Sequence, residues 1–345
     1  MFPYQKYIRE NDYVDVAFNK VKNIDLKKII NYNKFKYTHT IEKIIKKYSL
    51  NNFAIESFYF DFSNDPYTNK YSTISLSDIF NEKARMKAHI KNKISPYDFF
   101  IKNKKKLLNE AKEITNKKKK YNFIREKIYE LHPYECTPFR PDLYTAIIKL
   151  FSLILNNKKL KILDPSSGWG DRLIGFLASD CADEYYSTDP NEKLLKGYAE
   201  IYNKLDNKKK YVLMIPRPFE GVEFYENYYD IVCTSPPFFD YEIYSDTNKN
   251  QSTNKYTDEK KWFDNFLDVL MINSTKYLKN NGYLILHISQ HENHNYLYWL
   301  LDKKYDNLSF CGIIGCAGES KRIHPLFIWK KNEKCTQISI KKLIP

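Results

Sequence analysis

The sequence predicts an α/β protein: a mostly parallel sheet in the carboxyl-terminal part, preceded by a basic and mainly helical module. Strand-like and helix-like runs alternate after about residue 133, and such alternation implies right-handed crossovers and a sheet covered on both faces. Turn signals at His132, Pro133, Pro138 and Pro141 separate this part from the preceding helices. We therefore expect two domains, residues 1–132 and 133–345.

The amino-terminal part carries helical spacing interrupted by aromatic residues. Residues 24–48 repeat apolar side chains every three or four positions, which predicts helices with one buried face. The aromatic-rich residues 52–62 predict a strand or hairpin edge, and residues 77–101 predict a helix broken at Ser95 and Pro96. Residues 102–129 predict one long, very basic helix. This region shows no internal repeat and no motif that carries chemistry.

The carboxyl-terminal part predicts a seven-stranded sheet. After a helix over residues 142–155, the expected parallel strands are residues 160–163, 185–188, 211–215, 230–234 and 283–289, with helices at residues 172–179, 192–205 and 262–278. Residues 308–316 and 326–329 form two further strand-like runs with no helix between them. They predict an antiparallel hairpin at the sheet edge.

The net charge of +14 is unevenly distributed along the chain. Residues 1–130 hold 28 Lys and Arg against 15 Asp and Glu, whereas residues 131–345 hold 28 against 27. Because Lys and Arg supply most of the sequence-independent affinity for phosphates, the first part is expected to contact DNA or RNA. The alternative is a solvated lysine-rich surface with no partner.

The cysteines and the first residues bear on the compartment. The six cysteines are scattered without a CxxC or a zinc-like grouping, so we expect free thiols, a reducing compartment and no metal site. Residues 1–6 lack the apolar segment of a signal peptide, and no apolar run is long enough to span a bilayer. These features predict an intracellular, cytoplasmic protein without membrane contact.

The first motif is Asp164-Pro-Ser-Ser-Gly-Trp-Gly-Asp171, where the first strand of the sheet turns into a helix. Gly168 and Gly170 allow a sharp turn and a close approach of the backbone to a ligand, and Pro165 belongs to the same turn. Neither GxGxxG nor GxxxxGK[ST] is present, and Asp164 would repel a phosphate, so the motif favours a cationic ligand. The alternative is a structural turn in which Asp171 caps the helix.

Two later loops offer further binding residues. Asp189 ends the second strand about 20 residues beyond Gly170, where a carboxylate can accept hydrogen bonds from ribose hydroxyls or cap the next helix. Phe219 and Glu220 follow the third strand and are placed to touch a base ring. The alternative for Glu220 is a solvated loop residue.

The second motif, Ser235-Pro-Pro-Phe238, follows the fourth strand. Two adjacent prolines remove two backbone donors, so the neighbouring carbonyls and Ser235 can accept hydrogen bonds from an exocyclic amino group. Phe238 can stack on the ring that carries this group. An aryl amine is a poor nucleophile, and hydrogen bonds that draw its lone pair out of conjugation prepare it for attack. The alternative is a Pro-Pro loop after a buried strand.

In this order and separation, the two motifs resemble motifs I and IV of the S-adenosylmethionine-dependent methyltransferases that modify amino groups of adenine or cytosine in nucleic acids. Residues 239–245 and 322–330 are similar to members from phages and large DNA viruses, and the resemblance covers residues 138–331. It implies a class I methyltransferase fold, Rossmann-like, with Asp164 near the methionine end of S-adenosyl-L-methionine. By the same analogy, Arg140 contacts the cofactor carboxylate.

The resemblance leaves the target open. Adenine enzymes of this family more often carry Asp or Asn where this chain has Ser235, so adenine N6 and cytosine N4 both stay possible, in DNA or RNA. The polar stretch of residues 245–261 is short, and the stretch after Ser289 is no longer, which leaves little room for a separate target-recognition domain after the second motif. We therefore expect the basic module to recognise the target. The alternatives are methylation of glutamine or an amine in a protein, and a non-catalytic nucleic-acid-binding subunit. The chain can also work as an oligomer or with a partner subunit.

Overall fold

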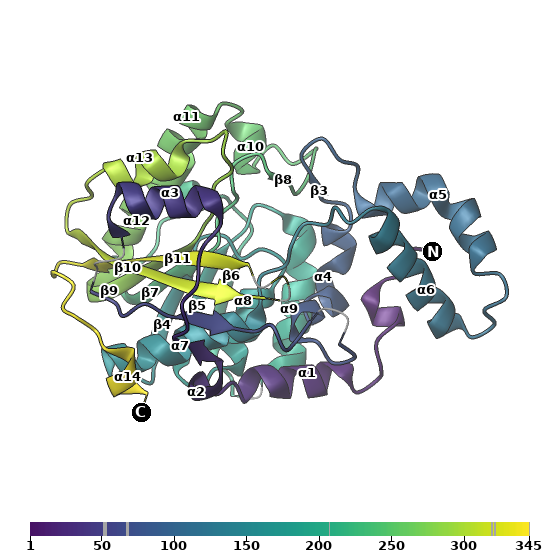
Figure 1. The fold of residues 1–345 in the computed structure, drawn as a ribbon, viewed down its shortest axis with the longest axis horizontal. Coiled ribbons are helices and arrows are strands. Elements are labelled where there is room, and N and C mark those ends of the chain that lie inside the picture. Colours follow the sequence, from purple (N-terminus) through teal and green to yellow (C-terminus); the bar gives the residue numbers. More distant parts are fainter. Residues whose placement is uncertain (51–53, 67–68, 207, 319, 321, 345) are drawn as a thin grey trace.

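The computed structural model describes residues 1–50, 54–66, 69–206, 208–318, 320 and 322–344 (Figure 1). Its centre is a nine-stranded sheet in the order β1-β2-β10-β11-β9-β7-β4-β5-β6. The strands are β1 Ile30–Asn31, β2 Tyr59–Asp61, β4 Leu160–Asp164, β5 Ala182–Thr188, β6 Tyr211–Ile215, β7 Tyr229–Thr234, β9 Leu278–His287, β10 Leu308–Ala317 and β11 Ile323–Lys331. A separate pair joins β3 His89–Ile90 to β8 Glu242–Ile243.

Seven of these strands confirm the predicted sheet. Strands β4, β5, β6, β7 and β9 run parallel to one another, and β10 and β11 form the antiparallel hairpin beside β9. The predicted arrangement of five parallel strands finished by an antiparallel hairpin is therefore confirmed. The remaining two strands are an addition from the amino-terminal part, because β2 pairs in parallel with β10 and β1 pairs with β2.

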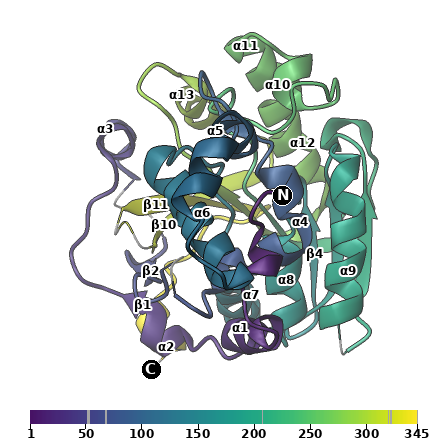
Figure 2. The same ribbon diagram turned by 90° about the vertical axis from the view of Figure 1, so that its right-hand side faces the viewer.

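Helices cover both faces of the sheet (Figures 1 and 2). One face carries α1 Tyr13–Lys22, α2 Leu26–Ile29, α7 Pro141–Leu155, α8 Asp171–Ala178 and α9 Leu195–Leu205. The other carries α3 His39–Lys47, the π-helical segment Phe263–Leu267, α12 Asp268–Tyr277 and α13 Tyr296–Asp302. Strand side chains alternate between the two cores, as with Ile162 and Leu163, because successive residues of a strand point to opposite faces.

The remaining helices lie at the rim or outside the sheet. They are α4 Asp78–Arg85, α5 Pro96–Glu110, α6 Lys117–Leu131, α10 Ser252–Lys255, α11 Glu259–Trp262 and α14 Ile340–Leu343, and short 3₁₀ turns include Gln5–Tyr7, Thr73–Ser75, Glu192–Leu194 and Phe219–Gly221. The single long basic helix predicted over residues 102–129 is wrong: α5 ends at Glu110, and the chain reverses before α6. Asn116 starts the second helix by accepting a hydrogen bond from the backbone N–H of Lys119.

The amino-terminal part is not packed by itself. Tyr13 and Val21 of α1, and Phe58 and Phe60 around β2, share one hydrophobic core with strands β4, β5 and β7. Helix α3 joins the core on the opposite face. The division at residues 132 and 133 stays a prediction. Most buried apolar residues of the first ninety pack against the second part of the chain, whereas Phe2 and Met86 pack against α5 and α6. The predicted strand over residues 52–62 is present as β2, although residues 52 and 53 lie outside the described residues.

Helices α5 and α6 project from the body as a hairpin (Figure 1). A buried ion-pair network fixes its base: Glu135 Oε2 accepts hydrogen bonds from Arg125 Nη2 at 3.0 Å and from Arg85 Nη1 at 3.1 Å. Although burial of Glu135 acts in the opposite direction, Arg125 and Arg85 lower the pKa of this carboxyl to about 2. The carboxylate is therefore ionised at neutral pH, and it ties α6 to α4.

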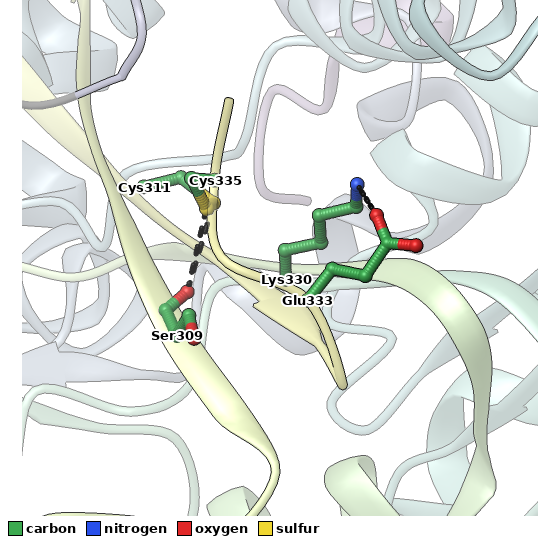
Figure 3. Close-up of a disulfide and its surroundings, with 5 residues drawn as sticks. All are labelled: Ser309, Cys311, Lys330, Glu333 and Cys335. Carbon is green, nitrogen blue, oxygen red and sulfur yellow. Dashed lines mark hydrogen bonds and ion pairs between the residues drawn. A yellow bond between two sulfur atoms is a disulfide. The ribbon is translucent and has the colours of Figure 1, made fainter. Parts of the chain in front are cut away.

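One cysteine pair departs from the expectation of free thiols. Cys311 of β10 and Cys335, after β11, form a disulfide with their Cα atoms 5.4 Å apart, and Cys335 Sγ lies 3.7 Å from the carbonyl oxygen of Ser309 (Figure 3). The expectation is wrong for this pair because the segment that follows β11 returns alongside β10. Cys136, Cys181, Cys233 and Cys316 are free thiols. Among the described residues, no helix is both long and apolar enough to cross a membrane.

Candidate active site

The carboxyl ends of the parallel strands open onto a cavity of about 830 Å³. Every residue predicted for the site lines this cavity except Asp164 and Gly170: Arg140, Pro165, Gly168, Asp189, Phe219, Glu220, Ser235, Pro236, Pro237 and Phe238. Its volume lies within the usual range for ligand pockets. The fold therefore gathers loops that are far apart in the sequence around one space.

The glycine turn after β4 has the backbone that its sequence predicts. Gly168 and Gly170 adopt φ values of +63° and +101°, and the N–H of Gly168 donates to Asp189 Oδ2 at 3.0 Å. A β-carbon on Gly170 would lie 2.6 Å from Ile201 Cδ1, because α9 packs directly on the turn. Gly170 thus allows the turn to pack closely on α9, whereas Gly168 lines the cavity.

We expect Gly170→Ala to lower the free energy of unfolding by about 1–3 kcal/mol, since an alanine is strained at this positive φ and also meets Ile201. Urea unfolding measures this loss. Gly221→Ala is the matched control, because a β-carbon there meets nothing within 4 Å, and its stability should stay near that of the wild type. Equal stability of the two variants would contradict the strain.

Asp164 does not face the cavity, contrary to the expectation that it contacts the ligand. It is completely buried, and its Oδ2 accepts hydrogen bonds from Arg172 Nε at 2.7 Å and from the Tyr185 hydroxyl at 2.6 Å. The N–H of Ser166 donates to Oδ1 at 3.2 Å. Its ionic partner is therefore an arginine of the protein, and its role is to hold that arginine in place.

Asp171 and Arg172, at the start of α8, are the charged residues that line the cavity beside Gly168. Neither carboxylate oxygen of Asp171 makes a hydrogen bond within the described residues, although the nearby Ser77 hydroxyl favours the ionised form. Burial, and secondarily Asp78, raise the pKa of Asp171 to about 7. Arg172 Nη2 likewise has no hydrogen-bond partner among the described residues.

These two side chains carry opposite charges, and both Asp171 oxygens and Arg172 Nη2 are buried atoms without a hydrogen-bond partner among the described residues. The Arg172 guanidinium lies over the Phe139 ring, 5.2 Å from its centroid, and its Nε is held by Asp164. Sequence reasoning considered Asp171 only as a helix cap and did not single out Arg172. The sequence signal that could have identified both residues is their opposite charge directly after the glycine turn.

Arg140 lines the cavity, but the protein already occupies most of its donors. Its Nε and Nη2 donate to the two carboxylate oxygens of Asp142 at 3.0 and 2.8 Å, and its Nη1 donates to the carbonyl oxygen of Asp65 at 3.3 Å. Contact between Arg140 and a ligand carboxylate stays a prediction. Arg172, with its free Nη2, is the better placed cation.

Asp189, Phe219 and Glu220 border the cavity beyond the glycine turn. The N–H groups of Asn191 and Gly168 donate to the two oxygens of Asp189 at 2.9 and 3.0 Å, while burial raises the pKa of this carboxyl to about 6. Glu220 Oε1 accepts from Lys255 Nζ at 3.0 Å, and its Oε2 makes no hydrogen bond to a described residue. Both carboxylates are thus fixed in orientation.

The loop after β7 brings Ser235, Pro236, Pro237 and Phe238 into the lining of the same cavity. Ser235 Oγ lies 3.0 Å from the carbonyl oxygen of His287 and 3.1 Å from His287 Nδ1. His287 ends β9, and its ring lies 6.1 Å from that of Phe238 and 5.3 Å from that of Phe139, measured between centroids. Sequence reasoning missed His287, because nothing in the sequence pairs it with a serine 52 positions earlier.

No protein-family model and no curated protein sequence matches this chain. Solved structures that are similar include an rRNA methylase from Streptococcus thermophilus, with TM-score 0.37 and 10% identity over 54% of this chain and 95% of the other. TrmN from Thermus thermophilus has TM-score 0.39 and 12% identity over 63% and 68%. Magnesium protoporphyrin IX methyltransferase from Synechocystis PCC 6803, with bound S-adenosylmethionine, has TM-score 0.39 and 11% identity over 70% and 99%. We therefore assign roles in this site from the contacts of its own residues.

Proposed function

We propose that this chain is an S-adenosyl-L-methionine-dependent methyltransferase that methylates the exocyclic amino group of adenine or cytosine in DNA or RNA. The observation that supports it is one cavity whose lining brings together Asp171 and Arg172 beside the glycine turn and the Ser-Pro-Pro-Phe loop. A cofactor and an acceptor base can therefore share one space. The cofactor supplies a methyl group made electrophilic by its positively charged sulfur.

The charged residues of the cavity fit the cofactor. Its methionine end carries an ammonium and a carboxylate, which match the carboxylate of Asp171 and the free Nη2 of Arg172. Asp189, Phe219 and Glu220 line the same cavity, where Asp189 would accept from ribose hydroxyls and Phe219 and Glu220 would contact the adenine. This assignment keeps the predicted residues of the second and third loops and moves the methionine end from Asp164 to Asp171 and Arg172.

The acceptor base would lie against Phe238. A stacked ring there places its amino group near Ser235 and the proline loop, whose carbonyl groups can accept from the N–H bonds. In duplex DNA the base has to leave the helix first, at a cost of a few kcal/mol. The test is calorimetric titration with S-adenosylmethionine, followed by mass spectrometry of nucleosides from DNA and RNA incubated with protein and cofactor.

Methylated adenine or cytosine that disappears with Phe238→Ala supports the proposal. Cofactor binding without any modified nucleoside would direct the search to a protein acceptor. Absence of cofactor binding would overturn the proposal.

The projecting hairpin of α5 and α6 is the proposed nucleic-acid contact. Residues 96–131 hold eleven Lys and Arg against five Asp and Glu, and the segment stands away from the sheet (Figure 1). Tyr129 of α6 is 59% exposed and also lines the cavity, so the basic surface reaches the mouth of the site. A polyanion lying on this hairpin is therefore adjacent to the cavity, and Tyr129 offers a ring for base stacking.

Replacing Lys117, Lys118, Lys119 and Lys120 together with glutamine is expected to weaken DNA or RNA binding. The slope of log affinity against log salt should fall by about 0.7–0.9 for each lysine that contacts a phosphate, and fluorescence anisotropy across a salt series measures it. Glutamine at Lys193, Lys196, Lys204 and Lys209, around α9, removes the same charge elsewhere. An equal loss of slope in both variants would argue for general attraction without a specific surface.

A further inference from the structure

We propose that His287 is a catalytic residue of this site: its Nε2 accepts a hydrogen bond from the amino group to be methylated and takes up the proton which that group must lose. The inference rests on the proposed function. It adds a proton acceptor to a site in which the motifs supply stacking and hydrogen-bond acceptors.

The position of His287 places its ring at the acceptor wall. The residue is the last of β9, it lines the cavity, and its ring lies between Phe139 and Phe238. Phe238 belongs to the loop proposed to hold the base, so an amino group on that base lies close to the imidazole. The hydroxyl of Ser235 contacts both the ring and the backbone carbonyl group of His287.

The contacts of Ser235 decide which ring nitrogen of His287 carries the proton. The hydroxyl has one hydrogen and lies 3.0 Å from the His287 carbonyl oxygen, which can only accept. Donation to the carbonyl leaves Ser235 Oγ to accept from Nδ1–H at 3.1 Å. The opposite arrangement, with the hydroxyl donating to Nδ1, would leave two oxygen lone pairs facing each other without a proton. The Nδ1–H tautomer therefore satisfies both contacts and leaves Nε2 with a free lone pair.

Nε2 has no hydrogen-bond partner within the part of the chain that the structure describes, so this lone pair is available to a ligand. Burial lowers the pKa of His287 to about 3, and the neighbouring His324 and Arg172 act in the same direction. The imidazole is neutral at physiological pH, as a proton acceptor has to be. Ser235 then acts as a positioning residue that fixes the tautomer.

The proton balance requires such an acceptor. When the amino nitrogen forms its bond to the methyl carbon, its lone pair becomes the new N–C bond, and the electrons of the old S–C bond stay on sulfur. The nitrogen then carries a positive charge and must release one proton. An ammonium conjugated to an aromatic ring is a far stronger acid than an imidazolium, so even a histidine of lowered pKa can take this proton. The proton then passes to solvent, which restores the neutral ring.

Two measurements test the inference. Long-range ¹H–¹⁵N spectra of protein labelled at histidine are expected to show His287 protonated at Nδ1 and not at Nε2 at neutral pH, and a proton on Nε2 would overturn it. Single-turnover methyl transfer is then compared between wild type and His287→Asn, whose amide can replace Nδ1–H but not Nε2. We expect a rate lower by about 10²-fold or more, with unchanged binding of S-adenosylmethionine.

The controls separate this role from a structural one. His287→Gln places an amide near the position of Nε2 and should also be slow, because an amide cannot hold the proton. His89→Asn changes a histidine outside the cavity, bonded to Asp246, and should leave the rate unchanged. If the wild type is active and the His287→Asn variant is equally active, the role of His287 is overturned and the proposed function is not. A wild type that binds no S-adenosylmethionine overturns the proposed function, and this inference with it.

Discussion

Arg172→Met is expected to lower the free energy of unfolding by about 3–5 kcal/mol, the largest stability effect of any single change considered for this site. Arg172 Nε donates to Asp164 Oδ2 at 2.7 Å, and the two side chains are only 4% and 0% exposed. Removing the guanidinium leaves the Asp164 carboxylate buried with only a hydroxyl and one N–H as donors. An uncompensated charge at this depth costs more than the lost contacts of the arginine.

Urea unfolding of Arg172→Met, with the double variant Asp164→Asn/Arg172→Met, measures this effect. We expect the double variant to recover part of the lost stability, because it contains no buried unpaired charge. Lys196→Met is the control for an exposed ion pair: Lys196 and Glu200 are 88% and 50% exposed, and the loss should be no more than about 1 kcal/mol. A double variant less stable than Arg172→Met would show that the charge of Asp164 is not the cause.

Asp171→Asn is expected to weaken S-adenosylmethionine binding by about 10- to 150-fold, since it replaces a charge-assisted contact to the cofactor ammonium worth about 1.5–3 kcal/mol. The same change should stabilise the ligand-free protein. Burial raises the pKa of Asp171 from 3.8 to about 7, so between these values the folded state binds more protons than the unfolded one. Wild-type stability therefore falls as pH rises through this window, and asparagine has no proton to lose.

The difference in unfolding free energy between Asp171→Asn and wild type should grow from pH 4 to pH 7 and then level off, at a value on the order of 4 kcal/mol. Urea titrations across this range, with calorimetric titration of the cofactor at pH 7.5, measure both effects. Comparison of the two proteins at each pH isolates Asp171 from Asp189 and Glu82, whose pKa values burial also raises. A pH-independent difference would mean that Asp171 does not titrate in this window.

Much of the fold could be predicted because its signals are local. The alternation of apolar strands with amphipathic helices predicts that β4, β5, β6, β7 and β9 run parallel, since a parallel pair needs a crossover between its strands. Glycine at positions 168 and 170 predicts a turn with positive φ, and both residues have positive φ in the structure. Each of these features follows from neighbouring residues alone.

The amino-terminal part was predicted less well because its structure depends on distant partners. Strand β2 is only three residues long and lies between β1 and β10, and it forms because β10 offers a row of backbone groups for pairing. The basic helix expected over residues 102–129 is a hairpin, and the break lies where Asn116 caps a second helix. The helical spacing of apolar residues does not reveal this chain reversal, because lysines lie on both sides of it.

The sequence by itself determined the parallel sheet, the glycine turn after β4 and the loop Ser235-Pro-Pro-Phe238 at its carboxyl edge, because chain direction and backbone conformation depend on adjacent residues. Only the tertiary structure decided which charges meet. It pairs Asp164 with Arg172, places Asp171 in the lining of the cavity, and sets His287 against Ser235. A carboxylate is a binding residue or a buried ion-pair partner according to what lies within hydrogen-bonding distance, and those neighbours come from other strands and helices.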